Sequence, residues 1–210
     1  MSMRLDLDYP FTGRWLVQNS PANRVPSHGT PLFGLSHAID FVPVDDAGRS
    51  APYTLTSFLR PEPAEIIPGF GRPLTAPVDG VVVGVHSTEP DHRSYRGLPS
   101  VGYAVTQRRR LAAGWWGLSG NHVLIETRGA DGGTAVVVLC HLHQGSPVVR
   151  PGQPAQRGEA VGRCGNSGNS TEPHVHVHAV DGRDISRASA VPISFRGGLP
   201  RNGETVDGGQ

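Results

Sequence analysis

The chain has 210 residues, enough for one domain with long loops, and its 19 basic and 18 acidic residues nearly balance. Near neutrality gives no reason to expect nucleic acid as a partner, and the lack of any lysine excludes a carrier domain modified on a lysine. The 28 glycines and 19 prolines favour many short strands joined by turns over a bundle of helices.

The N-terminal stretch "MSMRLDLDYPFTGRWLV" does not resemble a signal peptide, because it lacks a basic start followed by an apolar core. No stretch approaches the roughly 18 apolar residues of a membrane-spanning helix. The sequence as written therefore predicts a cytoplasmic protein without a membrane span. A cell-wall or secreted location stays open if a leader was removed or if export is non-classical.

We expect three parts: a lead segment over residues 1–24, one domain over 25–195 and a polar, glycine-rich, flexible tail over 196–210. The domain contains an insertion over about 86–120, where the strand patterns dissolve into an irregular stretch. Loops of that length inside a compact domain are usually functional or mobile. Helix-length periodicity is scarce along the chain, so we predict a mainly antiparallel β fold with one site assembled from several strands.

Strand patterns lie on both sides of the insertion. The segment "HAIDFVPV" indicates an early strand that carries Asp40. Asp79 and Gly80 form a turn signal before the apolar strand "VVVGV". After the insertion, "NHVLIETR" and "TAVVVLCHLH" flank the turn "GADGG" and predict a β-hairpin.

Three histidines, His174, His176 and His178, occupy every second position of "EPHVHVH". Because successive side chains of a strand point to opposite faces, these three imidazoles share one face. The valines between them favour a strand. A histidine-lined face is costly to bury unless the imidazoles bind a metal or transfer protons, while a surface strand with solvated histidines is the alternative.

A second pair, His141 and His143 in "CHLHQGS", repeats the same spacing. Asp40 lies on the early strand, with His37 three residues before it and His28 farther back. Catalytic zinc sites take three protein ligands from His, Asp, Glu or Cys and leave one position for water. The chain offers one carboxylate and several imidazoles for such a site.

Several of these segments are similar, in content and in order, to those of the lysostaphin-type, or LytM-like, zinc metallopeptidases. The resemblance covers roughly Ser27 to His178, and its most specific part is "GNSGNSTEPHVHV". It implies an antiparallel β-sheet or β-sandwich of the lysostaphin/LytM type, also called a duplicated hybrid motif, with long loops. The segments that carry it are "SHG", "HAIDF", "DGVVVGV", "GNHVLIE", "CHLHQGS", "PGQPAQRGEAVG" and "GNSGNSTEPHVHVH".

The resemblance also implies a role for individual residues. Asp40 and His176 match zinc ligands of the family, and His141 and His174 match its two catalytic histidines. The implied activity is that of a zinc-dependent endopeptidase, in which zinc-activated water cleaves peptide bonds with the help of these two histidines. The implied substrate is peptidoglycan, in its cross-bridges or stem peptides.

The third zinc ligand is where the chain departs from the commonest family pattern, which has a histidine four residues before the aspartate. That position is Ser36 here. His37 is three residues before Asp40, so on a regular strand the two would face opposite ways, unless a bulge re-aims His37. Some members instead use a loop histidine, and His28 in "PSHGTPLFGLSHAIDF" fits that version. Strand parity therefore favours His28 over His37.

Two other functions compete with the peptidase hypothesis. A degenerate member of the family would bind a peptide or a partner protein without cutting it, and a zinc protein of another chemistry would act on small molecules in a closed pocket. His143 and His178 share faces with the proposed site, and we expect structural or supporting histidines there rather than ligands. The sequence leaves the cleaved bond and the oligomeric state open.

Overall fold

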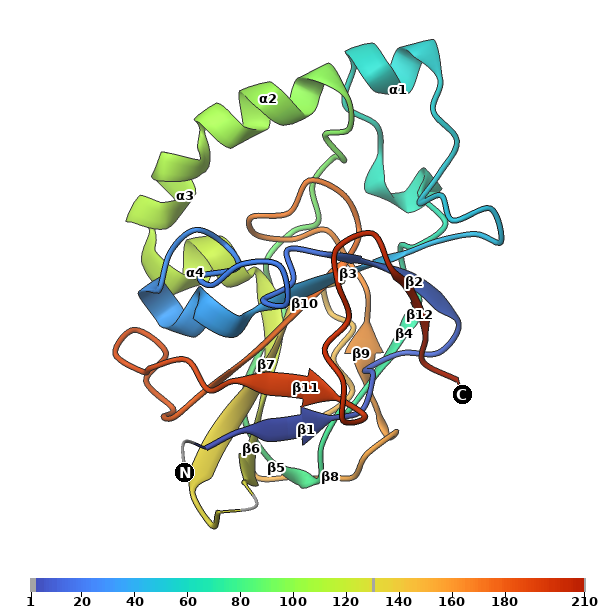
Figure 1. Cartoon of the computed structure of the whole chain (residues 1–210). Helices are drawn as coiled ribbons and strands as arrows, with labels where there is room; N and C mark the ends of the chain where they lie inside the picture. The colour runs from blue at the N-terminus through green and yellow to red at the C-terminus, as the bar shows by residue number, and fades with distance from the viewer. Residues whose placement is uncertain (1–2, 130, 210) are drawn as a thin grey trace.

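The computed structural model describes residues 3–129 and 131–209, and it confirms the predicted mainly β, antiparallel fold (Figure 1). Its centre is an eight-stranded sheet in which every pairing between the strands is antiparallel. In sheet order the strands are β12 (Thr205–Asp207), β2 (Arg14–Gln18), β3 (Ile39–Pro43), β10 (Val175–Val180), β7 (Thr134–Leu142), β6 (Asn121–Arg128), β5 (Gly80–His86) and β8 (Pro154–Ala155). The predicted hairpin is formed by β6 and β7.

Two small sheets complete the β structure. β1 (Leu5–Leu7) pairs in parallel with β11 (Ile193–Phe195), and β4 (Pro73–Thr75) pairs antiparallel with β9 (Ala160–Arg163). Side chains from all four strands belong to the largest buried hydrophobic cluster, together with alternate residues of the central strands. The small sheets therefore cover one face of the large sheet and enclose the main core.

Alternation along β10 gives the large sheet two different faces. Val175 and Val177 belong to the main core, whereas Val180 belongs to a smaller cluster on the opposite face. His176 and His178 have the parity of Val180 and share that second face. The smaller cluster consists of Trp115, Val136, Val138, Cys140, Val180 and Ile185.

The insertion over 86–120 contains helices, where the sequence predicted an irregular stretch. α2 (Leu98–Val105), α3 (Gln107–Ala112) and α4 (Gly114–Ser119) follow one another and form the arch at the upper left of Figure 1. None exceeds eight residues, and none has a side-chain hydrogen bond at its N-cap. Helices this short show little periodicity, which explains why the sequence pattern missed them.

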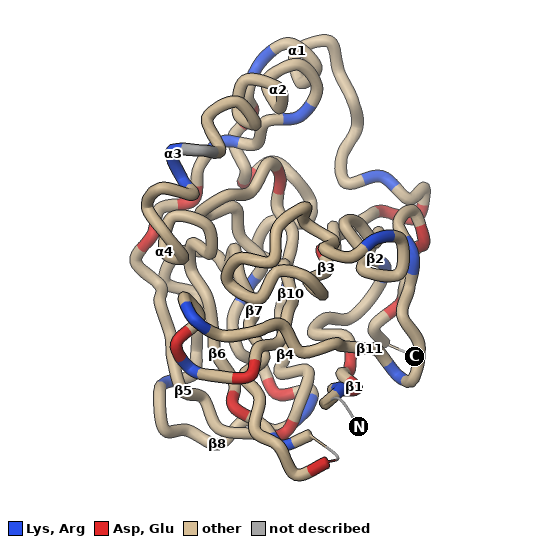
Figure 2. Tube along the Cα trace, turned by 60° about the vertical axis from the view of Figure 1, so that its left-hand side comes forward, with Lys and Arg blue, Asp and Glu red and all other residues tan. Residues whose placement is uncertain are grey.

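Three further helical segments lie before the insertion: η1 (Leu32–His37), α1 (Leu55–Leu59) and η2 (Ala64–Ile66). Only α1 has a capping box, made by Thr54 and Ser57. Along the chain, arginines and acidic residues are interspersed, as Figure 2 shows. Within the described ranges, no helix has both the length and the apolar character needed to cross a membrane.

Both ends of the chain contribute strands to the large sheet. β2, within the expected lead segment, pairs with β3, and β12, within the expected tail, pairs with β2. A three-residue strand such as β12 shows no alternation along the sequence, so no local pattern predicts it. The pairing of β2 with β3 matters for the site, since it sets Gln18 opposite Asp40.

Candidate metal centre

One row of register partners crosses the large sheet and carries polar side chains that are far apart in sequence. Asp40 on β3 pairs with His176 on β10, and His176 pairs in turn with Cys140 on β7. Cys140 pairs with His122 on β6. Register partners on neighbouring strands point to the same face, so Asp40 and His176 meet although 136 residues separate them.

The Asp40 carboxylate is the centre of a compact polar cluster. Its Oδ1 lies 2.9 Å from His176 Nδ1, and its Oδ2 lies 3.1 Å from His28 Nε2. Asn19 donates its side-chain amide to the same Oδ2 at 2.7 Å. One donor atom each from His28, Asp40 and His176 lies within 4.8 Å of the others, and Asp40 and His176 are both buried. This group could hold a metal ion.

His28 reaches Asp40 from the loop before η1, and Ser27 fixes its ring. The Ser27 hydroxyl donates to the carbonyl of Leu35 at 3.1 Å and lies 3.0 Å from His28 Nδ1. Because its only proton is used, the Ser27 oxygen accepts a hydrogen bond from His28 Nδ1–H. A neutral His28 therefore points the lone pair of Nε2 at a carboxylate oxygen. Two lone pairs at that distance require a second proton or a cation between them.

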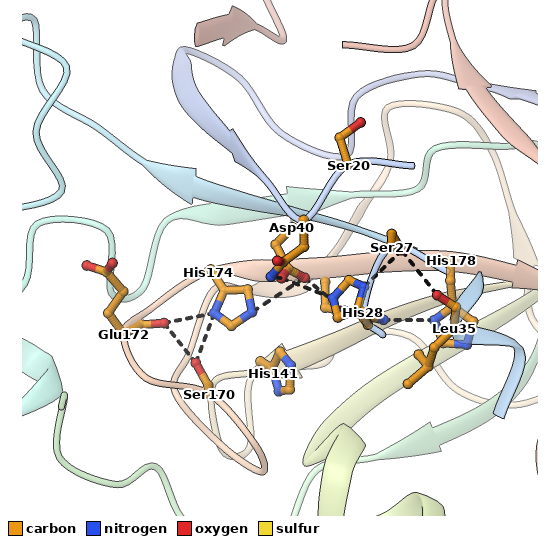
Figure 3. A network of polar contacts seen from close by, with 12 residues as sticks. Ser20, Ser27, His28, Leu35, Asp40, His141, Ser170, Glu172, His174 and His178 are labelled. Carbon is orange, nitrogen blue, oxygen red and sulfur yellow. Dashed lines mark hydrogen bonds and ion pairs between the residues drawn. The ribbon is translucent and has the colours of Figure 1, made fainter. Parts of the chain in front are cut away.

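His141 and His174 lie beside this cluster, and backbone carbonyls fix their tautomers. His141 Nδ1 donates to the carbonyl of Ser167 at 2.9 Å, and His174 Nδ1 donates to the carbonyl of Glu172 at 2.9 Å. The two ring centroids are 4.7 Å apart, and His174 Nε2 is 3.7 Å from Asp40 Oδ1. In Figure 3, His174 and His28 lie on either side of Asp40. Each neutral ring keeps Nε2 free to accept a proton.

The structure thus brings together all five residues that the sequence singled out, namely His28, Asp40, His141, His174 and His176. His37, the other candidate for a third ligand, lies at the end of η1 and is absent from the metal-binding group found in the described part of the chain. Strand parity had favoured His28 over His37, and His28 lies 3.1 Å from Asp40.

Residues 65–187 match the model of the peptidase family M23. That stretch is more than half of the chain. The chain belongs to peptidase family M23. His141, His174 and His176 lie inside the matched stretch, whereas His28 and Asp40 precede it. The site therefore joins residues that precede the matched stretch to histidines that lie within it. No match was found among curated proteins.

Several solved structures resemble this M23 chain at low identity. The catalytic domain of the antimicrobial peptidase lysostaphin from Staphylococcus simulans is 15% identical over 85% of this chain and 88% of that chain, with a TM-score of 0.41. A putative peptidase M23 from Pseudomonas aeruginosa is 19% identical over 91% of this chain and 50% of that chain, with a TM-score of 0.41. A zinc-containing peptidase from Vibrio cholerae is 20% identical over 70% of this chain and 37% of that chain, with a TM-score of 0.36. The chain spans 39% of the length of the lysostaphin solved in solution.

The electrostatics of the M23 site favour the binding of a cation. Burial acts to raise the pKa of Asp40, but the close contacts with His28 and His176 outweigh it and hold that pKa well below its usual range. Burial lowers the pKa of His141 well below its usual value, and the neighbouring histidines lower it further. Burial also lowers the pKa of His176, opposed by Asp40. An ionised Asp40 carboxylate thus lies beside His141 and His176, whose pKa values burial lowers.

A pocket of about 840 Å³ opens over these residues. Part of its lining is the polar face of the sheet with the five site residues, and a second part comes from the helical insertion. That second wall is largely apolar and includes Val105, Leu111, Trp115 and Leu118, with Tyr103 beside them. Its volume lies within the range of about 300–1,000 Å³ that is typical of ligand-binding clefts.

Sequence reasoning missed the residues that orient the site. Asn19 holds Asp40, Ser27 holds His28, and the Ser167 carbonyl holds His141. The only sequence signal for Ser27 was its place next to His28 in the segment that resembles the family, and a backbone carbonyl leaves no signal at all. Of the two expected supporting histidines, His178 contacts His176, whereas His143 lies 3.7 Å from Asp91.

Proposed function

We propose that this M23 domain is a zinc-dependent metalloendopeptidase. The observation that carries the proposal is the convergence of His28, Asp40 and His176 on one point, with His141 and His174 beside them in an open pocket. Two imidazoles and one carboxylate are a donor set that catalytic zinc sites use, and they leave a position for water or substrate. No residue with a metal-binding role in this scheme comes from the insertion.

The residues present fit zinc on chemical grounds. In its neutral form His28 would face Asp40 lone pair to lone pair, a contact that a divalent cation would turn from repulsive to attractive. His28 would offer Nε2, His176 Nδ1 and Asp40 a carboxylate oxygen. Zinc at such a site supplies Lewis-acid polarisation of a carbonyl and lowers the pKa of water toward neutrality.

The two remaining histidines supply proton transfer and hydrogen bonds. With Nδ1–H of each ring donated to a backbone carbonyl, Nε2 of His141 and of His174 is the basic atom. One Nε2 can accept a proton from the attacking water, and once protonated a ring can donate to the oxyanion of the tetrahedral intermediate or to the leaving amine. The fixed carbonyl partners keep both rings in the tautomer that this work requires.

The substrate that we propose is a peptide segment of peptidoglycan, in a cross-bridge or a stem peptide. Membership of the M23 family and a pocket of about 840 Å³ over the five site residues support it. Such a substrate would require that the protein reaches the cell wall, by secretion or by release. The cytoplasmic location predicted for the sequence as written stays a prediction.

Zinc content measured by elemental analysis tests the metal site. Purified protein should contain about one zinc per chain, and His176→Ala and His28→Ala should each lose it. His37→Ala is the matched control, because His37 lies in the same segment as His28 but outside the metal-binding group. No zinc in the parent protein, even after incubation with the metal, would contradict the proposal.

Digestion of purified peptidoglycan tests the activity. Zinc-loaded protein should release new amino termini from the wall material, and chelator should stop the release. A zinc-loaded protein that binds the wall material without releasing amino termini would instead support the alternative, a domain that binds peptide without cutting it.

A further inference from the structure

The side of His176 that faces away from Asp40 has a partner of its own. His176 Nε2 lies 3.1 Å from Nδ1 of His178, two residues farther along β10. His178 is fully buried, and its ring stands edge-on to Trp115 with the centroids 5.5 Å apart. Figure 3 shows His178 on the opposite side of the site from His174. The contact therefore lies between the polar cluster and the smaller apolar cluster.

Elementary imidazole chemistry fixes the direction of this hydrogen bond when Nδ1 of His176 is a ligand atom. A neutral ring that offers the lone pair of Nδ1 carries its proton on Nε2. That proton needs an acceptor, and Nδ1 of His178 is the atom within hydrogen-bond distance. Histidine ligands of metal ions almost always donate their second nitrogen to such an acceptor, which sets the tautomer and the plane of the ring.

A second observation singles out His178. Its Nε2 is buried and has no hydrogen-bond partner among the described residues. Buried polar atoms without partners are rare because each is costly, and an apolar side chain at this position would avoid that cost. The surroundings are apolar enough to accept one, since Trp115 and the valines of β7 pack nearby. The polar atom that His178 does use is Nδ1, on His176.

We infer that His178 is a positioning residue of the zinc site, which accepts the Nε2 proton of His176 and so keeps Nδ1 of His176 directed at the metal. The inference rests on the proposed function, because it assigns a role toward the metal that the function requires. His178 acts through His176 and touches neither substrate nor metal.

His122 serves as a control that distinguishes the positioning role of His178 from simple core packing. Like His178 it is a buried histidine on the same face of the sheet, and its ring also lies against Trp115, at 5.7 Å. However, His122 Nδ1 contacts the carbonyl of Gly120, and no contact between His122 and His176 is present in the described structure. Removing His122 therefore removes a buried imidazole without touching the metal ligand.

The experiment measures zinc affinity by competition with a chelator, for the parent protein and three variants. His178→Val should weaken zinc binding by about 10- to 100-fold. His178→Asn should stay within a few-fold of the parent, since its side-chain oxygen can replace Nδ1 as the acceptor. His122→Leu should leave the affinity unchanged. Thermal unfolding of the zinc-free proteins shows whether each variant folds, and His178→Leu replaces His178→Val if valine prevents folding.

A second readout follows the proton itself. In zinc-loaded protein labelled with nitrogen-15 on histidine, His176 should show a protonated Nε2 whose hydrogen-bonded signal is lost in His178→Val. A folded His178→Val that binds zinc as tightly as the parent would overturn the inference and leave the proposed function intact. Failure of the parent protein to bind zinc would instead overturn the proposed function itself.

Discussion

His141 shows how one residue at the site is held in an unusual backbone conformation. It is a buried, non-glycine residue with φ of 64°, in the left-handed region that most side chains avoid. Two hydrogen bonds hold it there: Gly165 N–H donates to the His141 carbonyl at 3.0 Å, and His141 Nδ1 donates to the Ser167 carbonyl. Such conformations persist where the surroundings over-determine them, often at functional sites.

The site residues should separate into two groups by their effect on zinc. Asp40→Ala should abolish both zinc binding and peptide cleavage, because it removes a ligand carboxylate. His141→Asn should keep zinc but lower kcat by about 10²- to 10⁴-fold, because it removes a proton-transferring group. Asparagine tolerates the left-handed backbone, so this variant should fold. Elemental analysis and cleavage rates check both. Loss of zinc from His141→Asn would contradict the assignment.

His122 should make the zinc-free protein less stable in acid. Burial lowers its pKa from 6.5 to about 4. Between these two values the unfolded chain binds a proton that the folded protein does not, so the free energy of unfolding falls as pH drops below about 6.5. The contribution of His122 is about 2 kcal/mol between pH 7 and pH 5.

Urea unfolding in the presence of chelator measures this effect. His122→Leu should lose less stability than the parent protein over the same pH range, by about that amount. Equal pH dependence in the two proteins would show that His122 does not remain neutral in the fold.

At the scale of elements, η1 brings the His28 loop onto β10 through one glycine. Gly34 has φ of +73°, and a side chain there would collide with Cγ1 of Val180 on β10. Glycine is the residue that tolerates both the left-handed backbone and this close approach. The turn that it allows places Leu35 where its carbonyl accepts from Ser27, which in turn holds His28.

Gly34→Ala should therefore cost more stability than an equivalent change elsewhere. Gly48 is the matched control, with φ of +74° and open space, free of other atoms within 4 Å, where the alanine methyl group would lie. Both alanine variants should lose about 1–2 kcal/mol of stability, because alanine disfavours the left-handed backbone. Gly34→Ala should lose about 1–3 kcal/mol more, because its methyl group would overlap the side chain of Val180. Unfolding in urea measures the difference. Equal losses would mean that η1 can move away from β10 at little cost.

Elements also show what the sequence could and could not predict. Alternation in "PHVHVH" predicted a strand with its histidines on one face, and β10 is that strand. The same parity argument favoured His28 over His37, and His28 is the one of the two that contacts Asp40 in the structure. Local pattern sufficed there because strand geometry fixes the direction of each side chain. The contact between Asn19 and Asp40 depends instead on the pairing of β2 with β3, which no local pattern encodes. The helices of the insertion were missed for a related reason, since their positions depend on tertiary contacts.

At the scale of the whole molecule, the insertion is anchored to the loop that orients His141 and His174. Arg110 on α3 donates to the side chain of Asn169 at 2.6 Å and stacks on Tyr103, whose hydroxyl donates to the carbonyl of Gly168 at 2.8 Å. The neighbouring residues Ser167 and Ser170 contact His141 and His174. Movement of the apolar wall is therefore coupled to the rings that would transfer protons.

Arg110→Ala should loosen this connection without affecting the metal. Loss of a hydrogen bond from a charged group costs about 1.5–3 kcal/mol locally, so hydrogen exchange at the Asn169 amide, which donates to the Leu118 carbonyl, should accelerate about tenfold or more. Peptide cleavage should slow, while zinc content stays at the parent level, because Arg110 is not part of the metal-binding group. Arg109→Ala is the matched control: Arg109 lies on the same helix, is exposed, and its side chain makes no hydrogen bond in the described structure. If both variants exchange and cleave like the parent protein, the insertion lines the pocket without affecting the histidines. Slower cleavage in Arg110→Ala alone would show that the contact of the insertion with the Asn169 loop supports both the pocket wall and the histidines that transfer protons.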